Sequence, residues 1–134
     1  VADEHNIFGV SNITLDGYDE GDLPDPPVFG TNWIRLLFDR SEWDTAFGEN
    51  FTTDMQSNSF CGPKQWRLVV ESNAQGPLEL EFIFNNNVAL DVFENLVIEI
   101  FDKDQSHIIS NGTILEYDLE EYSPKEFLIE VEVN

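Results

Sequence analysis

Short stretches in which apolar and polar residues alternate dominate the chain after Gly30. The clearest are 66–71 (WRLVVE), 78–84 (LELEFIF) and 127–133 (FLIEVEV), where apolar side chains occupy every second position. A period of two is typical of a β-strand with one buried face and one face in water. The pattern therefore predicts three strands of a sheet that has a dry side and a wet side.

Shorter apolar runs predict further strands at 33–38, 51–55, 96–101 and 114–119. Turn-forming residues separate the runs at 85–87 (NNN), 102–105 (DKDQ), 110–112 (SNG) and 123–125 (SPK). Helical apolar spacing is absent from every stretch of ten or more residues. About seven short strands at this spacing predict an all-β fold, namely an antiparallel sandwich.

Residues 1–30 precede this pattern as an acidic leader rich in Gly and Pro, and residues 31–134 form the predicted sandwich domain. Within the leader, 7–15 (IFGVSNITL) can form one extended piece. Such a strand can add to the edge of a neighbouring copy of the chain. It can equally pack along its own sandwich, and the sequence leaves both arrangements open.

Charge narrows the choice of partners. The net charge is −21, from 27 acidic and six basic residues, while 41% of the residues are hydrophobic and eleven are Phe. A chain this apolar can bury a core. Its acidic surface repels nucleic acid and anionic lipid, so neither is an expected partner. It suits cations, strong salt or a basic partner, and no apolar stretch is long enough to cross a membrane.

The order of several motifs resembles a known family. The motifs are DGYD at 16–19, DLPDPP at 22–27, WRLVVES at 66–72, LELEF at 78–82 and LVIEIFD at 96–102. This order is similar to the immunoglobulin-like (fibronectin-III-like) β-sandwich domain of large secreted proteins from Bacteroidetes-like bacteria, of the kind found ahead of type IX sorting signals. The resemblance implies an extracellular immunoglobulin-like sandwich. Phe82 stands where the family's strand usually carries Trp.

Four leader aspartates fall three positions apart, at Asp16, Asp19, Asp22 and Asp25. A loop bent by Gly and Pro can fold carboxylates around a calcium ion, which takes six to eight oxygen ligands. The spacing is not that of an EF-hand. The other interpretation, which the sequence favours, is a solvated acidic linker. No cofactor is required, and Ca²⁺ is the one candidate ion.

A second acidic turn contains Asp102 and Asp104. Turn capping is the expected role of these two side chains, with a metal site as the alternative. Among the aromatic residues, Trp66 and Trp33 are expected in the core. Trp43 lies in a predicted loop and is the one candidate for contact with a polysaccharide, although anchoring of the loop is the favoured role.

Candidate glycosylation acceptors are of two kinds. Three N-x-T triplets begin at Asn12, Asn50 and Asn111. Thr45 lies in an Asp-Thr-Ala triplet, which resembles the O-glycosylation pattern of Bacteroidetes-like organisms. These four residues are the expected attachment points if the protein is a glycoprotein.

Catalytic patterns are not found in the sequence. The two histidines are His5 and His107, Cys61 is the single cysteine, and no HExxH, GxSxG or phosphate-binding glycine loop occurs. We therefore expect a structural domain without enzymatic activity, a subunit of a bacterial cell-surface assembly or filament. Its expected partners are copies of itself or other cell-surface proteins. The alternative is a carbohydrate-binding or adhesion module, calcium-dependent if the leader holds the ion.

Overall fold

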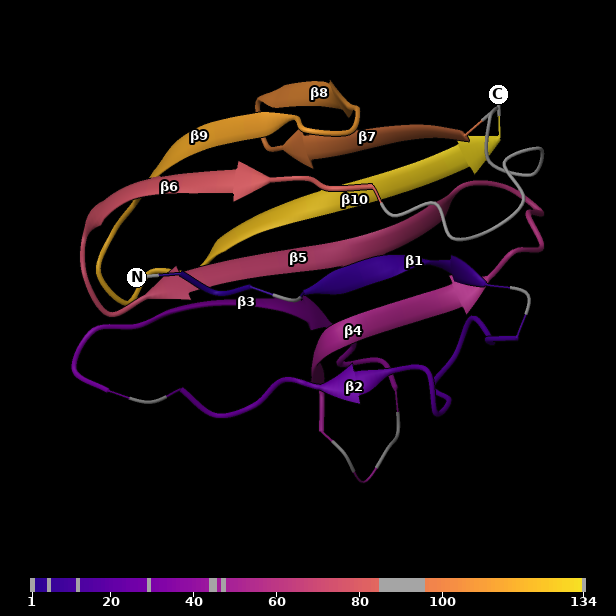
Figure 1. The fold of residues 1–134 in the computed structure, drawn as a ribbon, viewed down its shortest axis with the longest axis horizontal. Helices are drawn as coiled ribbons and strands as arrows, with labels where there is room; N and C mark the ends of the chain where they lie inside the picture. The colour runs from indigo at the N-terminus through magenta and orange to yellow at the C-terminus, as the bar shows by residue number, and fades with distance from the viewer. Residues whose placement is uncertain are drawn as a thin grey trace.

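The protein is all-β, as the alternation predicts. The computed structural model describes residues 2–4, 6–11, 13–28, 30–43, 46, 48–84 and 96–133. Within these residues there is no helix, and the ten strands (Figure 1) are β1 (Ile7–Ser11), β2 (Leu23–Pro24), β3 (Ile34–Asp39), β4 (Asn50–Ser57), β5 (Lys64–Ser72), β6 (Gly76–Glu81), β7 (Leu96–Asp102), β8 (Gln105–Ile109), β9 (Ile114–Leu119) and β10 (Lys125–Val133).

Eight of these strands form one sheet in the order β1-β4-β3-β5-β10-β7-β8, with β2 paired to β4 beside this path. Most neighbours are antiparallel, as predicted. The pair β1–β4 is parallel, so the sheet is mixed and the expectation of a purely antiparallel sheet is wrong at this point. The parallel pair arises because β1 comes from the leader, whose direction along β4 no hairpin constrains.

The leader wraps around β4. Thr53 of β4 pairs with Ile7 of β1 and also with Leu23 of β2. A strand residue has only two neighbours across the sheet, so β1 and β2 lie on opposite edges of β4. Because β3 pairs with the beginning of β4 on the same edge as β1, the two strands follow one another along that edge. Figure 1 shows β1 and β4 side by side, with β2 below them.

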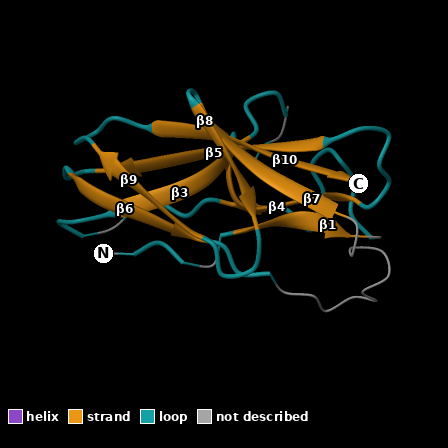
Figure 2. Ribbon diagram, turned by 90° about the horizontal axis from the view of Figure 1, so that it is seen from above, coloured by secondary structure: helices purple, strands orange, loops and turns teal. Residues whose placement is uncertain are grey.

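The strands β6 and β9 form a separate two-stranded sheet that covers part of the main one (Figures 1 and 2). Tyr117 of β9 packs its ring against Phe127 of β10 at a centroid distance of 4.9 Å. The core between the layers consists of Phe38, Trp66, Leu68, Val70, Leu78, Leu80, Phe82, Ile100, Ile109, Leu119, Phe127, Ile129 and Val131. The fold thus has two layers of very unequal size, so it is not clearly an immunoglobulin sandwich.

The period-two pattern places side chains correctly in the most regular strands. Along β5 every second residue from Lys64 to Ser72 is buried, and Trp66 is 0% exposed. Trp33, also expected in the core, is only half-buried and meets Tyr122 edge-on at 6.2 Å. The prediction from alternation therefore holds along β5, whereas Trp33 lies just before the first residue of β3 and is only partly covered.

Some boundaries differ from the expected ones. The strand expected at 78–84 ends at Glu81, and the N–H of Phe82 then donates to the carbonyl of Thr113 in the turn after β8. The strands β2 and β8 were not predicted at all. Each is short, and β8 follows directly on the acidic turn that the sequence pattern assigns to a loop. The turn expected at 85–87 lies outside the described residues.

The packing of β1 leads to a stability prediction. Phe8 is half-buried, and its ring lies 5.3 Å from that of Trp66 and 5.9 Å from that of Phe38. We expect Phe8→Ala to lower the free energy of unfolding by about 2 kcal/mol in urea titration, since it removes a partly buried ring. Ile13→Ala is the control, because Ile13 is 87% exposed. Equal, negligible effects of both substitutions would mean that β1 does not contribute to the core.

Candidate functional site

A buried ion pair joins β4 to the segment after β3. The Nε atom of Arg40 donates to Oδ2 of Asp54 at 2.5 Å, and Nη2 donates to Oδ1 at 3.3 Å. The Asp54 side chain is 0% exposed and that of Arg40 is 11% exposed. Asp54 lies next to Thr53 in β4, and both residues are buried.

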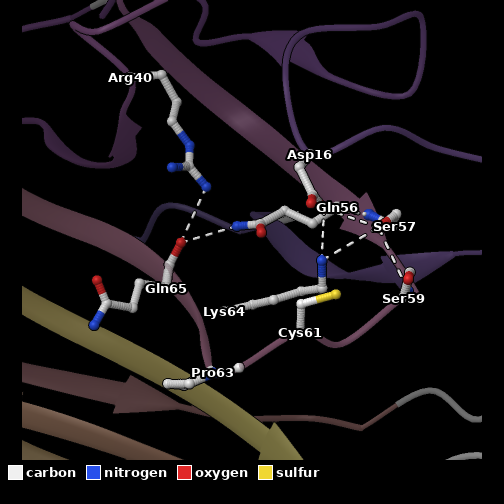
Figure 3. Close-up of a pocket in the computed structure, with 10 residues that line it drawn as sticks. Asp16, Arg40, Gln56, Ser57, Ser59, Cys61, Pro63, Lys64 and Gln65 are labelled. Atoms are coloured by element: carbon white, nitrogen blue, oxygen red, sulfur yellow. Dashed lines mark hydrogen bonds and ion pairs between the residues drawn. The ribbon is translucent and has the colours of Figure 1, made fainter.

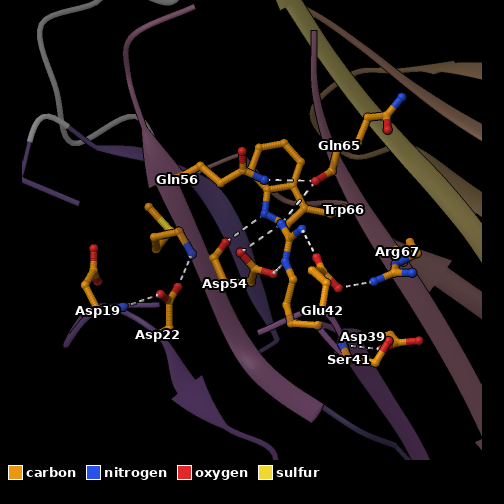
Figure 4. Close-up of polar contacts among 12 residues, drawn as sticks. Asp19, Asp22, Asp39, Ser41, Glu42, Asp54, Gln56, Gln65, Trp66 and Arg67 are labelled. Carbon is orange, nitrogen blue, oxygen red and sulfur yellow. Dashed lines mark hydrogen bonds and ion pairs between the residues drawn. The ribbon is translucent and has the colours of Figure 1, made fainter. Parts of the chain in front are cut away.

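Hydrogen bonds extend this pair into a network (Figure 4). The Trp66 indole N–H donates to the Asp54 carbonyl at 2.9 Å. The carbonyl of Gln65 accepts from both Arg40 Nη2 at 3.1 Å and Gln56 Nε2 at 2.9 Å. The buried amide and indole groups thus have the partners that burial requires.

Burial and pairing act in opposite directions on the two charges. Loss of solvent raises the pKa of Asp54, although the hydrogen bonds and charge of Arg40 oppose this rise. Loss of solvent lowers the pKa of Arg40, but its contacts with Asp54 and Glu42 outweigh this, and the pKa lies above its ordinary value. The guanidinium therefore stays charged at neutral pH and balances the carboxylate.

The first leader aspartate is tied to the last residue of β4 and the first residue of β5. Oδ1 of Asp16 accepts from Ser57 N at 3.0 Å, from Ser57 Oγ at 2.9 Å and from Lys64 Nζ at 2.6 Å (Figure 3). Burial alone raises the pKa of Asp16, but these contacts outweigh it and lower the pKa. The Lys64 side chain is only 6% exposed, so this ion pair is half enclosed by the protein.

The next two aspartates bind backbone N–H groups. Asp19 accepts from Leu15 N at 2.5 Å and from Gly21 N at 2.7 Å, which closes a local turn. Asp22 is 2% exposed and accepts from Met55 N of β4 at 2.8 Å and from Asp19 N at 3.0 Å. Asp19 therefore folds the leader, and Asp22 fastens it to β4.

The fourth aspartate, Asp25, faces Arg35 of β3 at 4.0 Å, and its own N–H donates to the Asn50 carbonyl. The four leader aspartates thus face different partners. Among the described residues, no group of three or more His, Cys, Asp or Glu side chains is arranged to hold a metal ion. The structure does not bring the four predicted calcium ligands together, and it accounts for their spacing by contacts to backbone and cations.

An open depression of about 620 Å³ lies beside this network. Figure 3 shows Asp16, Arg40, Cys61, Lys64 and Gln65 on its walls. The guanidinium and the ammonium group are already engaged with carboxylates, and Cys61 is exposed. Arg40 thus binds Asp54 of β4, and Lys64 binds Asp16 of the leader. This arrangement is suitable for holding strands and leader together.

The second acidic turn joins β7 to β8 at the opposite edge of the main sheet from β1 and β4. Asp102 accepts from the N–H of Lys103 at 2.7 Å and forms an ion pair with Lys125 at 3.2 Å. Asp104 is exposed in the turn. Both residues line a second open depression of about 530 Å³ together with His107. Asp102 thus contacts the backbone of its own turn and the side chain of Lys125.

Trp43 is half-buried at the surface and lies among side chains of the leader and β4. Its ring meets Phe51 edge-on at 5.1 Å and Tyr18 at 6.2 Å, and the guanidinium carbon of Arg40 lies 5.0 Å from the ring centroid. These contacts anchor the loop after β3 to the leader. They leave part of the indole accessible.

The structure describes two of the four glycosylation candidates. Asn50, at the start of β4, and Asn111, in the turn before β9, are both exposed. Oδ1 of Asn111 accepts from Phe84 N at 2.9 Å. Asn12 and Thr45 lie outside the described residues.

Comparison with known proteins identified no relative, since no family model, curated protein or solved structure matches the chain. The immunoglobulin-like family therefore stays a prediction from sequence motifs. The described residues contain no helix with the length and apolarity needed to span a membrane.

Sequence reasoning missed the residues that hold this site together. Arg40, Asp54 and Lys64 were not singled out, yet they carry the strongest polar contacts. The composition was one signal. Because the chain has six cations and 27 acids, any buried carboxylate has few cations available as partners, and each cation is a candidate. The position of Asp54 inside an expected strand (51–55) was the second signal.

We predict that the Arg40–Asp54 pair is a main anchor of the fold. Arg40→Met keeps an apolar stem but leaves a buried carboxylate without its cation, so the free energy of unfolding at pH 7 should fall by about 3–5 kcal/mol. The control Arg67→Met removes only a half-exposed pair with Glu42 and should cost less than about 1 kcal/mol. Urea denaturation of both variants measures the difference, and similar losses would contradict the prediction.

Asp22 should make stability depend on pH. Burial raises its pKa to about 6, against the opposing effect of its two backbone hydrogen bonds, and the charges of Asp54 and Asp19 add to the rise. The folded state then binds a proton more tightly than the unfolded state. The free energy of unfolding should therefore fall as the pH rises from about 4 to about 6.

The variant Asp22→Asn removes this proton while keeping the size of the side chain. Between pH 4 and pH 6.5 the unmodified protein should lose about 2 kcal/mol more than the variant does. The difference between the two pH slopes is the test, because all other carboxylates are common to both proteins. Parallel slopes would show that Asp22 does not titrate in this range.

Proposed function

We propose that the chain is a non-catalytic extracellular structural domain, a building block of a bacterial cell-surface assembly. One observation carries this proposal. The charged side chains around the larger depression are paired with one another and with the leader, for example Arg40 with Asp54 and Lys64 with Asp16. Groups committed to holding strands and leader together serve rigidity rather than turnover of a substrate.

The surface supports the same role. With 27 acidic and six basic residues, the surface carries a large excess of carboxylates, which bind water and hydrated cations. Such a surface suits an extracellular medium rich in salt or calcium. The motif order that resembles secreted immunoglobulin-like domains and the exposed Asn50 and Asn111 triplets agree with this location.

Assembly with other copies would use the leader strand. Phe8 and Val10 of β1 pack against the core, while the backbone of β1 pairs with residues 53–57 of β4 in parallel. A neighbouring copy has the same sequence, so its β1 can make the same contacts. In this proposal, exchange of β1 between copies produces a head-to-tail polymer.

A pair of cysteines tests the exchange in the full chain. Gly9 pairs in register with Met55, and a Cβ at Gly9 would lie 3.4 Å from Met55 Cε. In a Cys61→Ser background, Gly9→Cys with Met55→Cys should give a ladder of disulfide-linked multimers on a non-reducing gel after assembly. The Cys61→Ser protein alone should give none.

Links formed only within single chains would rule out strand exchange. Electron microscopy of the same material then separates this result from failure of the structural role itself. Ordered layers or filaments without intermolecular links would keep the structural role and exclude exchange. Monodisperse single chains would contradict both.

A second candidate function is binding of a polysaccharide, calcium-dependent if the leader takes the ion. The observation that favours it is the pair of half-exposed rings of Trp43 and Tyr18, which meet edge-on at the surface. Aromatic rings with one accessible side can stack on sugars. Retention on glycan beads that Trp43→Ala abolishes, while circular dichroism shows that the variant stays folded at the assay temperature, would support this function.

A further inference from the structure

The free edge of β8 has an unusual composition. β8 ends the main sheet and pairs only with β7 in the described chain, where the backbone groups on its other edge have no partner. Exposed edge strands are normally protected from further pairing by charged residues or by Pro. β8 has the sequence QSHII, without an acid or Pro, and Ile108 is 62% exposed. The edge is therefore open to an additional strand.

The second depression runs beside this edge. Gln105 and His107 of β8 form part of its lining, and Glu116 and Asp118 of β9 form another part. Tyr117 also lines it, and its buried hydroxyl has no hydrogen-bond partner in the described residues. A segment that pairs with β8 would therefore extend along this depression and meet β9.

The negative charge at this depression is not balanced. Glu116 and Asp118 are exposed on one face of β9, and Glu116 stands directly opposite Glu79 of β6. Like charges in directly opposite positions destabilise a sheet. All six cations of the chain are described, and none forms an ion pair with Asp104, Glu116 or Asp118. Of the lining acids, Asp102 has a cation, Lys125.

We propose that β8 and the adjacent depression bind an extended segment of a partner that carries Lys or Arg at alternate positions. The backbone of the segment would add to β8 as a new edge strand. Glu116 and Asp118 are two residues apart on one strand, about 7 Å, which equals the spacing of alternate side chains on the bound segment. Basic side chains on one face can thus reach both carboxylates.

Charge selects this occupant over a second copy of the chain. Another copy brings a net charge of −21 towards the same carboxylates, whereas a basic segment relieves the repulsion between Glu79 and Glu116. The inference goes beyond the structural role proposed above and does not depend on it. Polymerisation can occur or fail whether or not this edge binds a basic segment.

Two synthetic nine-residue peptides with alternating Lys and Thr test the backbone part of the proposal. One peptide is unmodified, and the other is N-methylated at every second residue, which blocks strand pairing but keeps the charge. With the full chain, the unmodified peptide should slow amide hydrogen exchange at residues 105–109 at least about tenfold, which corresponds to about 1.4 kcal/mol. Equal binding of both peptides, or no protection of β8, would overturn the proposal.

Matched charge variants test the acidic part. Glu116→Gln with Asp118→Asn should weaken binding of the unmodified peptide about fivefold in calorimetry. The control, Glu20→Gln with Glu49→Gln, removes the same charge from exposed sites in the leader and just before β4, and should change affinity by less than about twofold. Equal weakening in both variants would show attraction to net charge alone and would overturn the site. Concentration-dependent dimers with protection of β8 in the absence of peptide would replace the basic partner by a second copy.

Discussion

The buried ion pair between Arg40 and Asp54 is the interaction that holds β4 to the segment after β3. A carboxylate that is 0% exposed is stable there only because a guanidinium covers it. The same guanidinium also binds the Gln65 carbonyl and Glu42, so one cation organises three segments of the chain. Because the chain has six cations for 27 acids, the position of each cation determines which carboxylate has a charged partner. Five of the six form ion pairs with described acids, namely Arg35, Arg40, Lys64, Arg67 and Lys125.

The acidic leader is part of this organisation and is not a passive linker in the structure. Its aspartates mainly accept hydrogen bonds from backbone N–H groups and from Lys64, and Asp25 forms an ion pair with Arg35 at 4.0 Å. Close packing accompanies these contacts, since a Cβ at Gly21 would lie 2.8 Å from Thr14 Cγ2 and 3.0 Å from Asp19 Oδ1. A carboxylate every third residue therefore gives a segment without long strands a fixed path around β4.

The two depressions differ in how far their charges are satisfied. At the larger one, carboxylates and cations neutralise each other, which favours a structural purpose. At the smaller one, exposed carboxylates of β9 stand next to an unpaired strand edge, which favours a partner with positive charge. A rigid domain can carry out both roles at once, because β4, beside the larger depression, and β8, beside the smaller one, lie towards opposite edges of the main sheet (Figure 1).

Local patterns in the sequence determined the strands, and non-local contacts decided how they are used. Alternation predicted β5, β6 and β10 and the burial of Trp66, because side chains of a strand point to opposite faces whatever its partners are. It could not predict the parallel pairing of β1 with β4, since paired residues such as Ile7 and Thr53 are more than forty positions apart in the sequence and no short turn constrains the strands. The burial of Asp54 and Asp22 was equally hidden, because Asp54 pairs with the guanidinium of Arg40 and Asp22 accepts from the N–H of Met55 in a strand distant in sequence. Only the tertiary structure brings those groups together. There each carboxylate is removed from water, so it needs a cation or a hydrogen-bond donor beside it.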